Sequence, residues 1–378
     1  MTTYHAAYAW LPDGVARDVR IVTDGALITE VVAGAQRGGE SLPGLTMPGF
    51  ANVHSHAFHR ALRGRTHHDQ GSFWTWRDLM YEVAARLDPD SYFALARAVY
   101  AEMALAGITA VGEFHYLHHG PDGTPYADPN AMGHALIAAA GEAGIRITLL
   151  DTLYLKSSVE GAPLEGVQRR FGDGDAAGWA SRVAGLTAAP HARIGAALHS
   201  VRAVPARFLP ELAGRELLHV HLSEQRAENE QCRAVHGCTP TELLDRHGLL
   251  GPSTTAVHAT HLTDTDVKAL GGAGAGACFC PTTERDLADG IGRARDLADA
   301  GAPLSLGSDS HAVIDMFEEI RGVEMNERLA SRRRGRFTPE ELVAAATRHA
   351  SLGWTDAGQI AVGRRADLVC VRLDSVRT

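Results

Sequence analysis

The sequence predicts an α/β fold, a (β/α)8 TIM-like barrel with a small flanking β-sandwich-like domain built from both chain ends. Two observations predict it. Short apolar runs alternate with helix-like segments over the middle of the chain, and both ends contain strand-like runs without such segments. The chain has 378 residues, 45% of them hydrophobic, which is enough to bury a large core. We expect residues 1–46 and 352–378 to form the β domain and residues 47–351 to form the barrel.

The β domain is predicted from short strands separated by turns. Residues 5–12 and 19–33 are such strands, and a glycine-rich loop follows them. Residues 358–376 return to the same composition near the other end of the chain. We therefore expect this tail to join the N-terminal strands.

The barrel is predicted from eight strands that alternate with helices. Helix-like segments such as residues 89–107 and 131–144 end in glycine just before an apolar run, which is typical of βα units. Eight alternating units favour closure into a barrel. The predicted strands are residues 45–54, 107–116, 145–154, 192–200, 216–223, 254–260, 274–281 and 302–310.

The composition argues against nucleic-acid and membrane partners. The formal net charge is −9, whereas a surface for nucleic acid or acidic lipid would be basic. We interpret the basic run at residues 331–337 as a solvated helix end or loop. No apolar run approaches the length of a membrane span, and no signal peptide is visible. Five scattered cysteines favour reduced thiols and a cytoplasmic location.

Residues 48–65, PGFANVHSHAFHRALRGR, contain the first candidate metal ligands. Side chains on a strand alternate between its two faces, so His54 and His56 point the same way. A His-x-His pair alone is weak evidence, because two polar residues where a strand meets a loop would look the same.

Three further strand ends supply imidazole or carboxylate groups. The C-terminal ends of barrel strands form one rim, where active sites are built. We therefore predict that these groups meet the His-x-His pair at one metal site. They are His219, His221 and Glu224 after the fifth strand, His258 and His261 after the sixth, and Asp309 after the eighth.

This set of groups predicts metal-dependent hydrolysis. Imidazole and carboxylate bind Zn²⁺ well, and iron accepts the same ligands, so we expect one divalent ion, with zinc preferred. A zinc-bound water loses a proton near neutral pH and becomes a nucleophile. Glu224, three residues after His221, is the natural candidate for proton transfer. We interpret Cys278 and Cys280, on an apolar strand with poor spacing for zinc, as core residues.

Taken together, the motifs resemble the amidohydrolase superfamily over essentially the whole chain. The pairing of "HVHLSE" with "SDS", without a candidate carboxylated lysine after the fourth strand, is similar to its mononuclear deaminase branch. The resemblance implies that the zinc ligands are His54, His56, His221 and Asp309, that Asp309 also accepts the proton of the bound water, that Glu224 shuttles protons, and that His258 orients or polarises the nucleophile.

Narrower motifs resemble one family of this branch, the formimidoylglutamate deiminases. That family converts N-formimidoyl-L-glutamate and water to N-formyl-L-glutamate and ammonia in histidine breakdown. The "FWTWR" and "EFHYLHH" stretches are far more specific than the metal ligands, which all relatives share. The matching stretches are HSHAFHRALRG, SFWTWRDLMY, GEFHYLHH, LHSVRAV, VHATHLTD, TTERDLADG and GSDSH.

The resemblance also gives a role to two arginines. The implied substrate is a small dianionic derivative of an amino acid, and the planar guanidinium group pairs well with carboxylates. Arg77 and Arg202 fall in segments that we expect to be loops near the rim. Matching positions in the family hold the substrate's acid groups, with Tyr116 and His199 close by. From position alone, a surface salt bridge is the favoured interpretation for Arg77, and it weighs equally with substrate binding for Arg202.

The chain departs from the family pattern at two places. Relatives commonly place glutamine where this chain has His59, so we expect an altered contact with the substrate at that residue. Relatives also usually continue beyond the length of this chain. We expect either a shortened C-terminus or a sequence that stops early, which would leave the β domain incomplete and its sheet edges exposed.

Other functions fit parts of the sequence. A related deaminase of guanine, cytosine or an adenosine derivative would need stacking aromatic residues and partners for ring nitrogens, but not two arginines. A non-catalytic barrel or an interaction role is disfavoured by the intact set of ligands.

We expect His219, His261 and His311 to support the ligands or to be structural. Relatives commonly form dimers, so we expect a homodimer.

Overall fold

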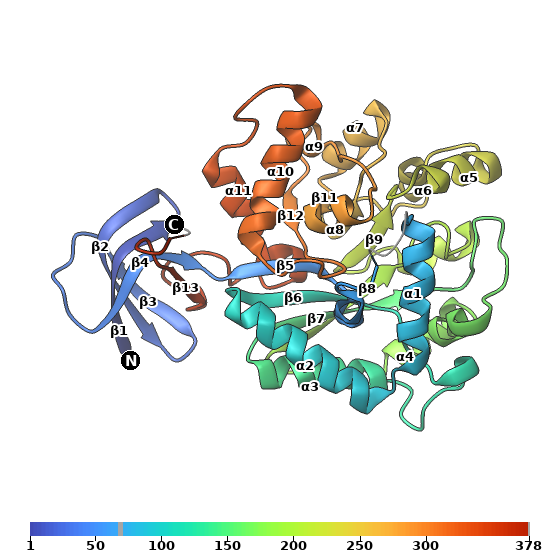
Figure 1. Cartoon of the computed structure of the whole chain (residues 1–378), viewed down its shortest axis with the longest axis horizontal. Helices are drawn as coiled ribbons and strands as arrows, with labels where there is room; N and C mark the ends of the chain where they lie inside the picture. Colours follow the sequence, from blue (N-terminus) through green and yellow to red (C-terminus); the bar gives the residue numbers. More distant parts are fainter. Residues whose placement is uncertain (67–70, 377–378) are drawn as a thin grey trace.

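The computed structural model describes residues 1–66 and 71–376. Over these ranges, an eight-stranded parallel sheet forms the barrel, and a separate five-stranded sheet lies at its side (Figure 1). This arrangement confirms the predicted barrel and the separate sheet built from the chain ends. The barrel strands follow one another in chain order: β5 (Phe50–Ser55), β6 (Ile108–His115), β7 (Arg146–Leu153), β8 (Ala192–Leu198), β9 (Leu218–Leu222), β10 (Thr254–His258), β11 (Gly276–Phe279) and β12 (Leu304–Leu306).

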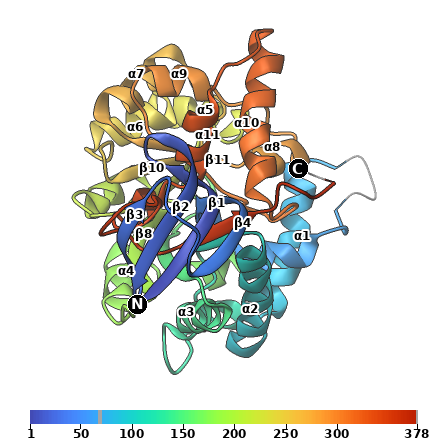
Figure 2. The same cartoon turned by 90° about the vertical axis from the view of Figure 1, so that its left-hand side faces the viewer.

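The small sheet joins the two ends of the chain (Figure 2). Its order is β13-β4-β1-β2-β3, and Val369 of the C-terminal strand pairs antiparallel with Met47. Residues 377 and 378, within the predicted segment 352–378, lie outside the described residues. The strands are β1 (Thr2–Leu11), β2 (Gly14–Asp24), β3 (Leu27–Val32), β4 (Glu40–Pro48) and β13 (Leu368–Val371).

The predicted first barrel strand, residues 45–54, is divided between the two sheets. Its first residues end β4 of the small sheet, and β5 of the barrel begins at Phe50. Gly49 lies between them, where a side chain would collide with Thr109. The apolar run is continuous across this point, so hydrophobicity alone could not show where the chain passes from one sheet to the other.

Helices follow the barrel strands and pack around them (Figure 1). Side-chain caps fix where several begin: Asp88 accepts a hydrogen bond from the backbone of Ser91, and Thr263 accepts one from Asp266. None of the helices in the described ranges is both long and apolar enough to cross a membrane. The helices are α1 (Phe73–Arg86), α2 (Pro89–Leu105), α3 (Ala131–Ala143), α4 (Ala176–Val183), α5 (Arg226–His236), α6 (Pro240–Arg246), α7 (Asp264–Ala273), α8 (Pro281–Asp286), α9 (Ala294–Asp299), α10 (Met316–Ser331) and α11 (Pro339–Ala346), with 3-10 turns η1 (Ala57–Leu62), η2 (Pro121–Gly123), η3 (Gly166–Phe171), η4 (Ala206–Leu212) and η5 (His349–Leu352).

The segment around Arg77 is helical, so the expectation of a loop there was wrong. Arg77 lies on α1, whose first turn is closed by a reciprocal cap between Ser72 and Thr75. Ser72, a residue type preferred at helix N-caps, stands immediately before the aromatic run and was the sequence signal for a helix start. The consequence is that Arg77 is carried on a regular element.

The ring closes where β12 meets β5. The backbone N–H of Asp309 donates to the carbonyl of His54 at 3.0 Å, and the N–H of His56 donates to the carbonyl of Asp309 at 3.1 Å. Gly307 packs directly on His54, because a Cβ at this glycine would lie 2.7 Å from the His54 Cβ. Closure of the barrel therefore depends on close backbone contact at this seam.

Gly307→Ala should lower stability by about 1–3 kcal/mol, because the added methyl group overpacks the seam. Thermal unfolding measures the effect. Gly272→Ala is the matched control, since Gly272 is exposed on α7 and a Cβ there meets no atom within 4 Å. The control should unfold at or above the wild-type temperature. An unchanged melting temperature for Gly307→Ala would show that the seam is not tightly packed.

Candidate active site

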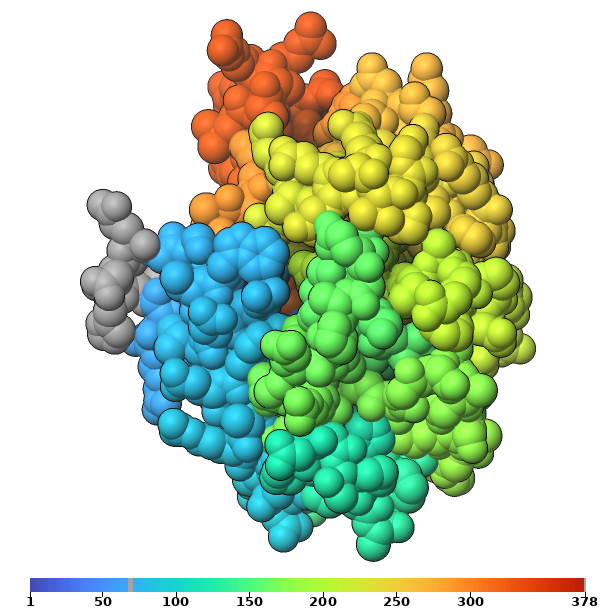
Figure 3. Space-filling view, turned by 90° about the vertical axis from the view of Figure 1, so that its right-hand side faces the viewer, coloured from blue at the N-terminus to red at the C-terminus, as the bar shows by residue number. Residues whose placement is uncertain are grey.

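The predicted site residues lie at the C-terminal ends of the barrel strands. Figure 3 looks onto this side of the molecule, where α1 in blue and segments in green and yellow surround a central hollow. One cavity is lined by all of the predicted catalytic and substrate-binding residues and by all of the predicted metal ligands except the deeper His54. Its lining residues are His56, His59, Phe73, Trp76, Arg77, Met80, Tyr81, Tyr116, Tyr154, Phe171, His199, Arg202, His221, Glu224, His258, Leu287 and Asp309.

The four predicted metal ligands are buried and converge on one point. The Nε2 atom of His221 lies 3.2 Å from Nε2 of His54 and 3.3 Å from Nε2 of His56. Oδ1 of Asp309 lies 3.4 Å from Nε2 of His54 and 3.6 Å from Nε2 of His56. Side chains from β5, β9 and the end of β12 thus bring three nitrogens and a carboxylate oxygen together.

Hydrogen bonds to backbone carbonyls fix which ring nitrogen carries the proton in two of these histidines. Nδ1 of His56 lies 2.8 Å from the carbonyl of Phe114, and Nδ1 of His221 lies 2.9 Å from the carbonyl of His199. A carbonyl only accepts, so each Nδ1 donates and each neutral ring keeps a lone pair on Nε2. Two lone pairs that face each other at 3.3 Å repel unless a cation lies between them. These residues therefore fit a metal ion.

The ionisation of these groups also suits a metal ion. Burial lowers the pKa of His54, His56 and His221, which keeps the imidazoles in the neutral form that binds metals. Burial alone would raise the pKa of Asp309, but the hydrogen bond from His54 and the nearby histidines outweigh it and hold that pKa well below its usual range. Asp309 is therefore a carboxylate at neutral pH.

Glu224 and Asp309 lie on either side of His258. Nε2 of His258 is 3.8 Å from Oε1 of Glu224 and 3.7 Å from Oδ2 of Asp309. Burial alone would lower the pKa of His258, but Glu224, Glu284 and Asp309 raise it well above its usual value. Burial raises the pKa of Glu224. Glu224 and His258 can therefore hold a proton close to the point where the metal ligands converge.

Two of these strand ends have unusual backbone geometry. His258 and Asp309 adopt φ angles of +67° and +44°, in the left-handed region that residues other than glycine rarely adopt. Such strain is found at functional sites, where the surrounding structure enforces it. Both of these residues, His258 and Asp309, line the cavity with their side chains.

The two predicted substrate-binding arginines have no salt bridge within the described residues. The guanidinium group of Arg77 instead lies over the ring of Trp74, 4.6 Å from its centroid, and the buried Nε atom has no hydrogen-bond partner there. Arg202 is half-buried and lines the same cavity from the loop after β8. Within the described residues, both guanidinium groups thus line the cavity without a carboxylate at salt-bridge distance.

His59, Tyr116 and His199 form the wall beside the metal ligands. Nε2 of His59 hydrogen-bonds the Tyr116 hydroxyl at 2.9 Å, and its ring lies 4.5 Å from that of His56. The ring of His199 packs 4.3 Å from Tyr154. His59 thus touches both a predicted metal ligand and a predicted substrate contact.

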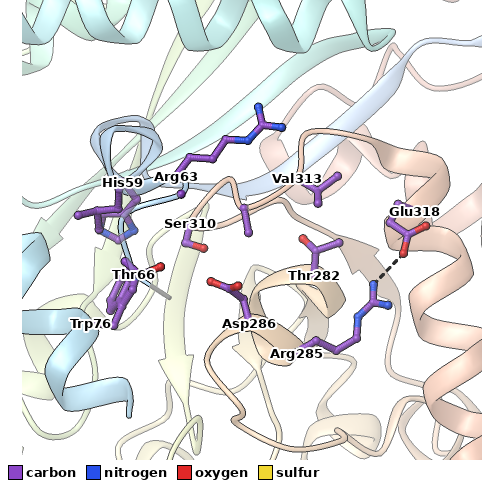
Figure 4. Close-up of a pocket in the computed structure, with 13 residues that line it drawn as sticks. His59, Arg63, Thr66, Trp76, Thr282, Arg285, Asp286, Ser310, Val313 and Glu318 are labelled. Carbon is purple, nitrogen blue, oxygen red and sulfur yellow. Dashed lines mark hydrogen bonds and ion pairs between the residues drawn. The ribbon is translucent and has the colours of Figure 1, made fainter. Parts of the chain in front are cut away.

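A larger outer pocket, of about 590 Å³, adjoins the inner cavity (Figure 4). His59 and Trp76 line both, and the ion pair between Arg285 and Glu318 lies on the opposite side of the outer pocket. The inner cavity, which most of the predicted metal ligands line, is the smaller of the two, at about 50 Å³.

Two further histidines of the sequence motifs, His311 and His219, have structural partners. His311 hydrogen-bonds Ser55 and Ser308, and His219 bonds the carbonyl of Ser351 at 2.9 Å. A second cluster consists of His115, His118 and Asp151, but both oxygens of its carboxylate are bonded by Arg182. Cys278 and Cys280 are buried in a core cluster, and the Cys280 thiol also comes within 4.8 Å of His258 and Asp309 ligand atoms.

Sequence reasoning missed two buried glutamates behind the site. Glu113 accepts hydrogen bonds from Ser55 Oγ and the backbone of Ala57, both at 2.6 Å, and burial raises its pKa to about 7. Glu284 lies 3.4 Å from Nδ1 of His258. The only sequence signal was an acidic residue inside a motif already noted, GEFHYLHH or TTERDLADG.

The chain is similar to several known proteins. Residues 45–377 match the model of the amidohydrolase family. Formimidoylglutamate deiminase of Pseudomonas aeruginosa is 40% identical over 98% of this chain and 86% of its own length, and 8-oxoguanine deaminase of the same organism is 30% identical over 88% and 75%. The crystal structure of an amidohydrolase from Brucella melitensis superposes with a TM-score of 0.88 at 34% identity, and covers 98% of this chain and 86% of that one.

Proposed function

The chain belongs to the amidohydrolase family and is a hydrolase of carbon–nitrogen bonds, and from this premise we propose that it converts N-formimidoyl-L-glutamate and water to N-formyl-L-glutamate and ammonia. One observation carries the proposal. Arg77 and Arg202, both without a salt bridge within the described residues, line the same cavity as the convergent histidines and Asp309. Two such cations fit the two carboxylates of this substrate. The similarity to the Pseudomonas aeruginosa deiminase supports the same choice.

The metal ligands in this proposal are His54, His56, His221 and Asp309, and the ion is zinc. When bound, zinc supplies a water whose proton dissociates near neutral pH. Asp309 uses Oδ1 toward the histidines, while Oδ2 faces His258 and accepts the proton. His258 directs Nε2 toward the same space and so orients the attacking oxygen.

The formimidoyl carbon is attacked to give a tetrahedral intermediate. Two protons reach the terminal nitrogen through Glu224: the one that Asp309 took from the water, and the one released from the hydroxyl of the intermediate as its carbonyl forms. The nitrogen then leaves as ammonia, and the carbon keeps the water oxygen as a formyl group. Arg77 and Arg202 hold the glutamyl carboxylates with Tyr116, His199 and His59 beside them, so that binding energy orients the reacting carbon.

A second candidate function is deamination of a nucleobase or nucleoside. The favouring observation is the aromatic lining of the cavity, which includes Tyr81, Tyr154 and Phe171, because aromatic rings can stack on a flat heterocycle. The similarity to 8-oxoguanine deaminase points the same way. The two arginines favour the dianionic substrate instead.

Two further features belong to the proposal. All five cysteines are free, which supports a cytoplasmic location. The expected partner is the small dianionic substrate alone, with neither nucleic acid nor membrane, and a homodimer remains our expectation for the assembly.

Steady-state ammonia release tests the proposed function. Zinc-loaded protein should release ammonia from N-formimidoyl-L-glutamate with a higher kcat/KM than from guanine, cytosine or adenosine. Removal of the metal by a chelator should abolish this release, and added zinc should restore it. Preferential release from one of the nucleobases or from adenosine would replace the proposal with the second candidate.

Arg202→Met should lower kcat/KM for formimidoylglutamate by about 10- to 100-fold, because a charge-assisted hydrogen bond contributes ~1.5–3 kcal/mol. The control is Arg207→Met, which removes an exposed arginine of η4 outside the cavity. Kinetics of both variants with the diacid provide the measurement. Equal values for Arg202→Met and wild type would mean that this arginine does not bind the substrate.

Glu224→Gln should reduce kcat by about 10²- to 10⁴-fold while zinc content stays at the wild-type level, because the amide cannot transfer the proton. Glu230→Gln, at an exposed position of α5, controls for loss of negative charge in the same region. Turnover and metal analysis are measured on the same samples. Full turnover by Glu224→Gln would exclude the proton-transfer role.

A further inference from the structure

Helix α8 (Pro281–Asp286) supplies no predicted metal ligand, yet it lies directly behind two residues of the proposed mechanism. It follows β11, and its side chains reach toward β10 and toward the turn after β12. The sequence CPTTERD that forms it contains two groups with such contacts, Thr283 and Glu284.

Glu284 contacts the side of His258 that faces away from the reactants. Its Oε1 atom lies 3.4 Å from Nδ1 of His258 and accepts the backbone N–H of Cys280 at 2.8 Å. The glutamate is only 2% exposed. Because the carboxylate is tied to the backbone, an Nδ1–H bond to it fixes the plane of the imidazole ring and directs Nε2 toward Glu224 and Asp309.

Thr283 contacts both neighbours of Asp309. Its hydroxyl donates to the carbonyl of Ser308 at 3.3 Å, and it accepts the backbone N–H of Ser310 at 3.2 Å. Asp309 between them has the left-handed φ of +44°. Thr283 therefore holds a strained turn from both sides.

Helix α8 is itself fixed from behind by α10. Glu319 is fully buried, and its carboxylate accepts hydrogen bonds from the backbone and the hydroxyl of Thr282. Gly322, one turn further along α10, lets Pro281 pack against the helix backbone. These contacts make α8 a rigid support.

We propose that α8 is a positioning element, in which Glu284 fixes the orientation of the His258 ring and Thr283 fixes the turn that presents Asp309. The inference rests on the proposed function, which gives His258 and Asp309 their roles. It adds two positioning residues that touch neither substrate nor metal. Each acts through a different residue, so their loss should have different effects.

Glu284→Leu tests the first residue. It should lower kcat about 10- to 100-fold with KM within about twofold of wild type, because His258 loses its orientation while the arginines still bind substrate. Glu284→Gln should recover most of the turnover, since its Oε1 can still accept from both donors. The matched control is Glu324→Leu, which removes a buried carboxylate that accepts backbone N–H groups at residues 335–337, away from the cavity. The control should unfold at a lower temperature with unchanged kcat.

Thr283→Val tests the second residue without any substrate. Its zinc dissociation constant, measured by competition with a chromogenic chelator, should rise about 10-fold or more, and Thr283→Ser should bind like wild type. Glu284→Leu should leave this constant unchanged. Crystal structures of the Glu284 variants should show a rotated His258 ring in the leucine variant and the native ring in the glutamine variant.

These measurements separate the inference from the proposed function. If wild-type protein does not turn over formimidoylglutamate, the proposed function fails, whereas zinc affinity and the His258 ring still test the role of α8. Wild-type turnover by Glu284→Leu, or equal loss in the leucine and glutamine variants, would overturn positioning by Glu284. Unchanged zinc affinity in Thr283→Val would overturn the role of Thr283.

Discussion

The site depends on closure of the barrel between its first and last strands. Two backbone hydrogen bonds join Asp309 to His54 and His56, so the contact that closes the ring also brings a carboxylate to the His-x-His pair. The absence of a side chain at Gly307 permits this approach. His221 arrives from β9, four strands from β5 in the sheet, and the closed ring brings its Nε2 atom within 3.3 Å of Nε2 of the other two histidines. Fold and metal site are therefore consequences of the same backbone pairing.

Burial and two backbone carbonyls determine the charge and the lone pairs of the groups that barrel closure brings together. The carbonyls of Phe114 and His199 leave the Nε2 lone pairs of His56 and His221 facing each other, an arrangement that is favourable only around a cation. Arg77 and Arg202, in contrast, are positively charged and lack salt bridges within the described ranges, so they favour an anion. One cavity thus combines a place for a cation at its floor with two fixed positive charges on its wall. This division of charge suits a substrate with acid groups at one end and a reactive carbon at the other.

Much of this arrangement could be predicted from the sequence, because a (β/α)8 barrel converts order along the chain into position around a ring. Predicted strands such as residues 107–116 and 254–260 contain β6 and β10, and the predicted ligands at strand ends lie together. Local sequence patterns predicted the wrong element where two kinds of structure have the same composition. The apolar run at residues 45–54 crosses between sheets, and the aromatic run before Arg77 is a capped helix. The contact of Glu284 with His258 joins residues 26 positions apart, so the local sequence pattern does not predict it.

The central claim is that ring closure builds a site for one divalent ion, and anomalous diffraction from crystals of the zinc-loaded protein tests it most directly. The crystals should contain one zinc ion bonded to Nε2 of His54, His56 and His221 and to Oδ1 of Asp309, at about 2.0–2.2 Å from each. Zinc bound instead at the cluster of His115, His118 and Asp151, or no zinc near the seam between β5 and β12, would contradict it.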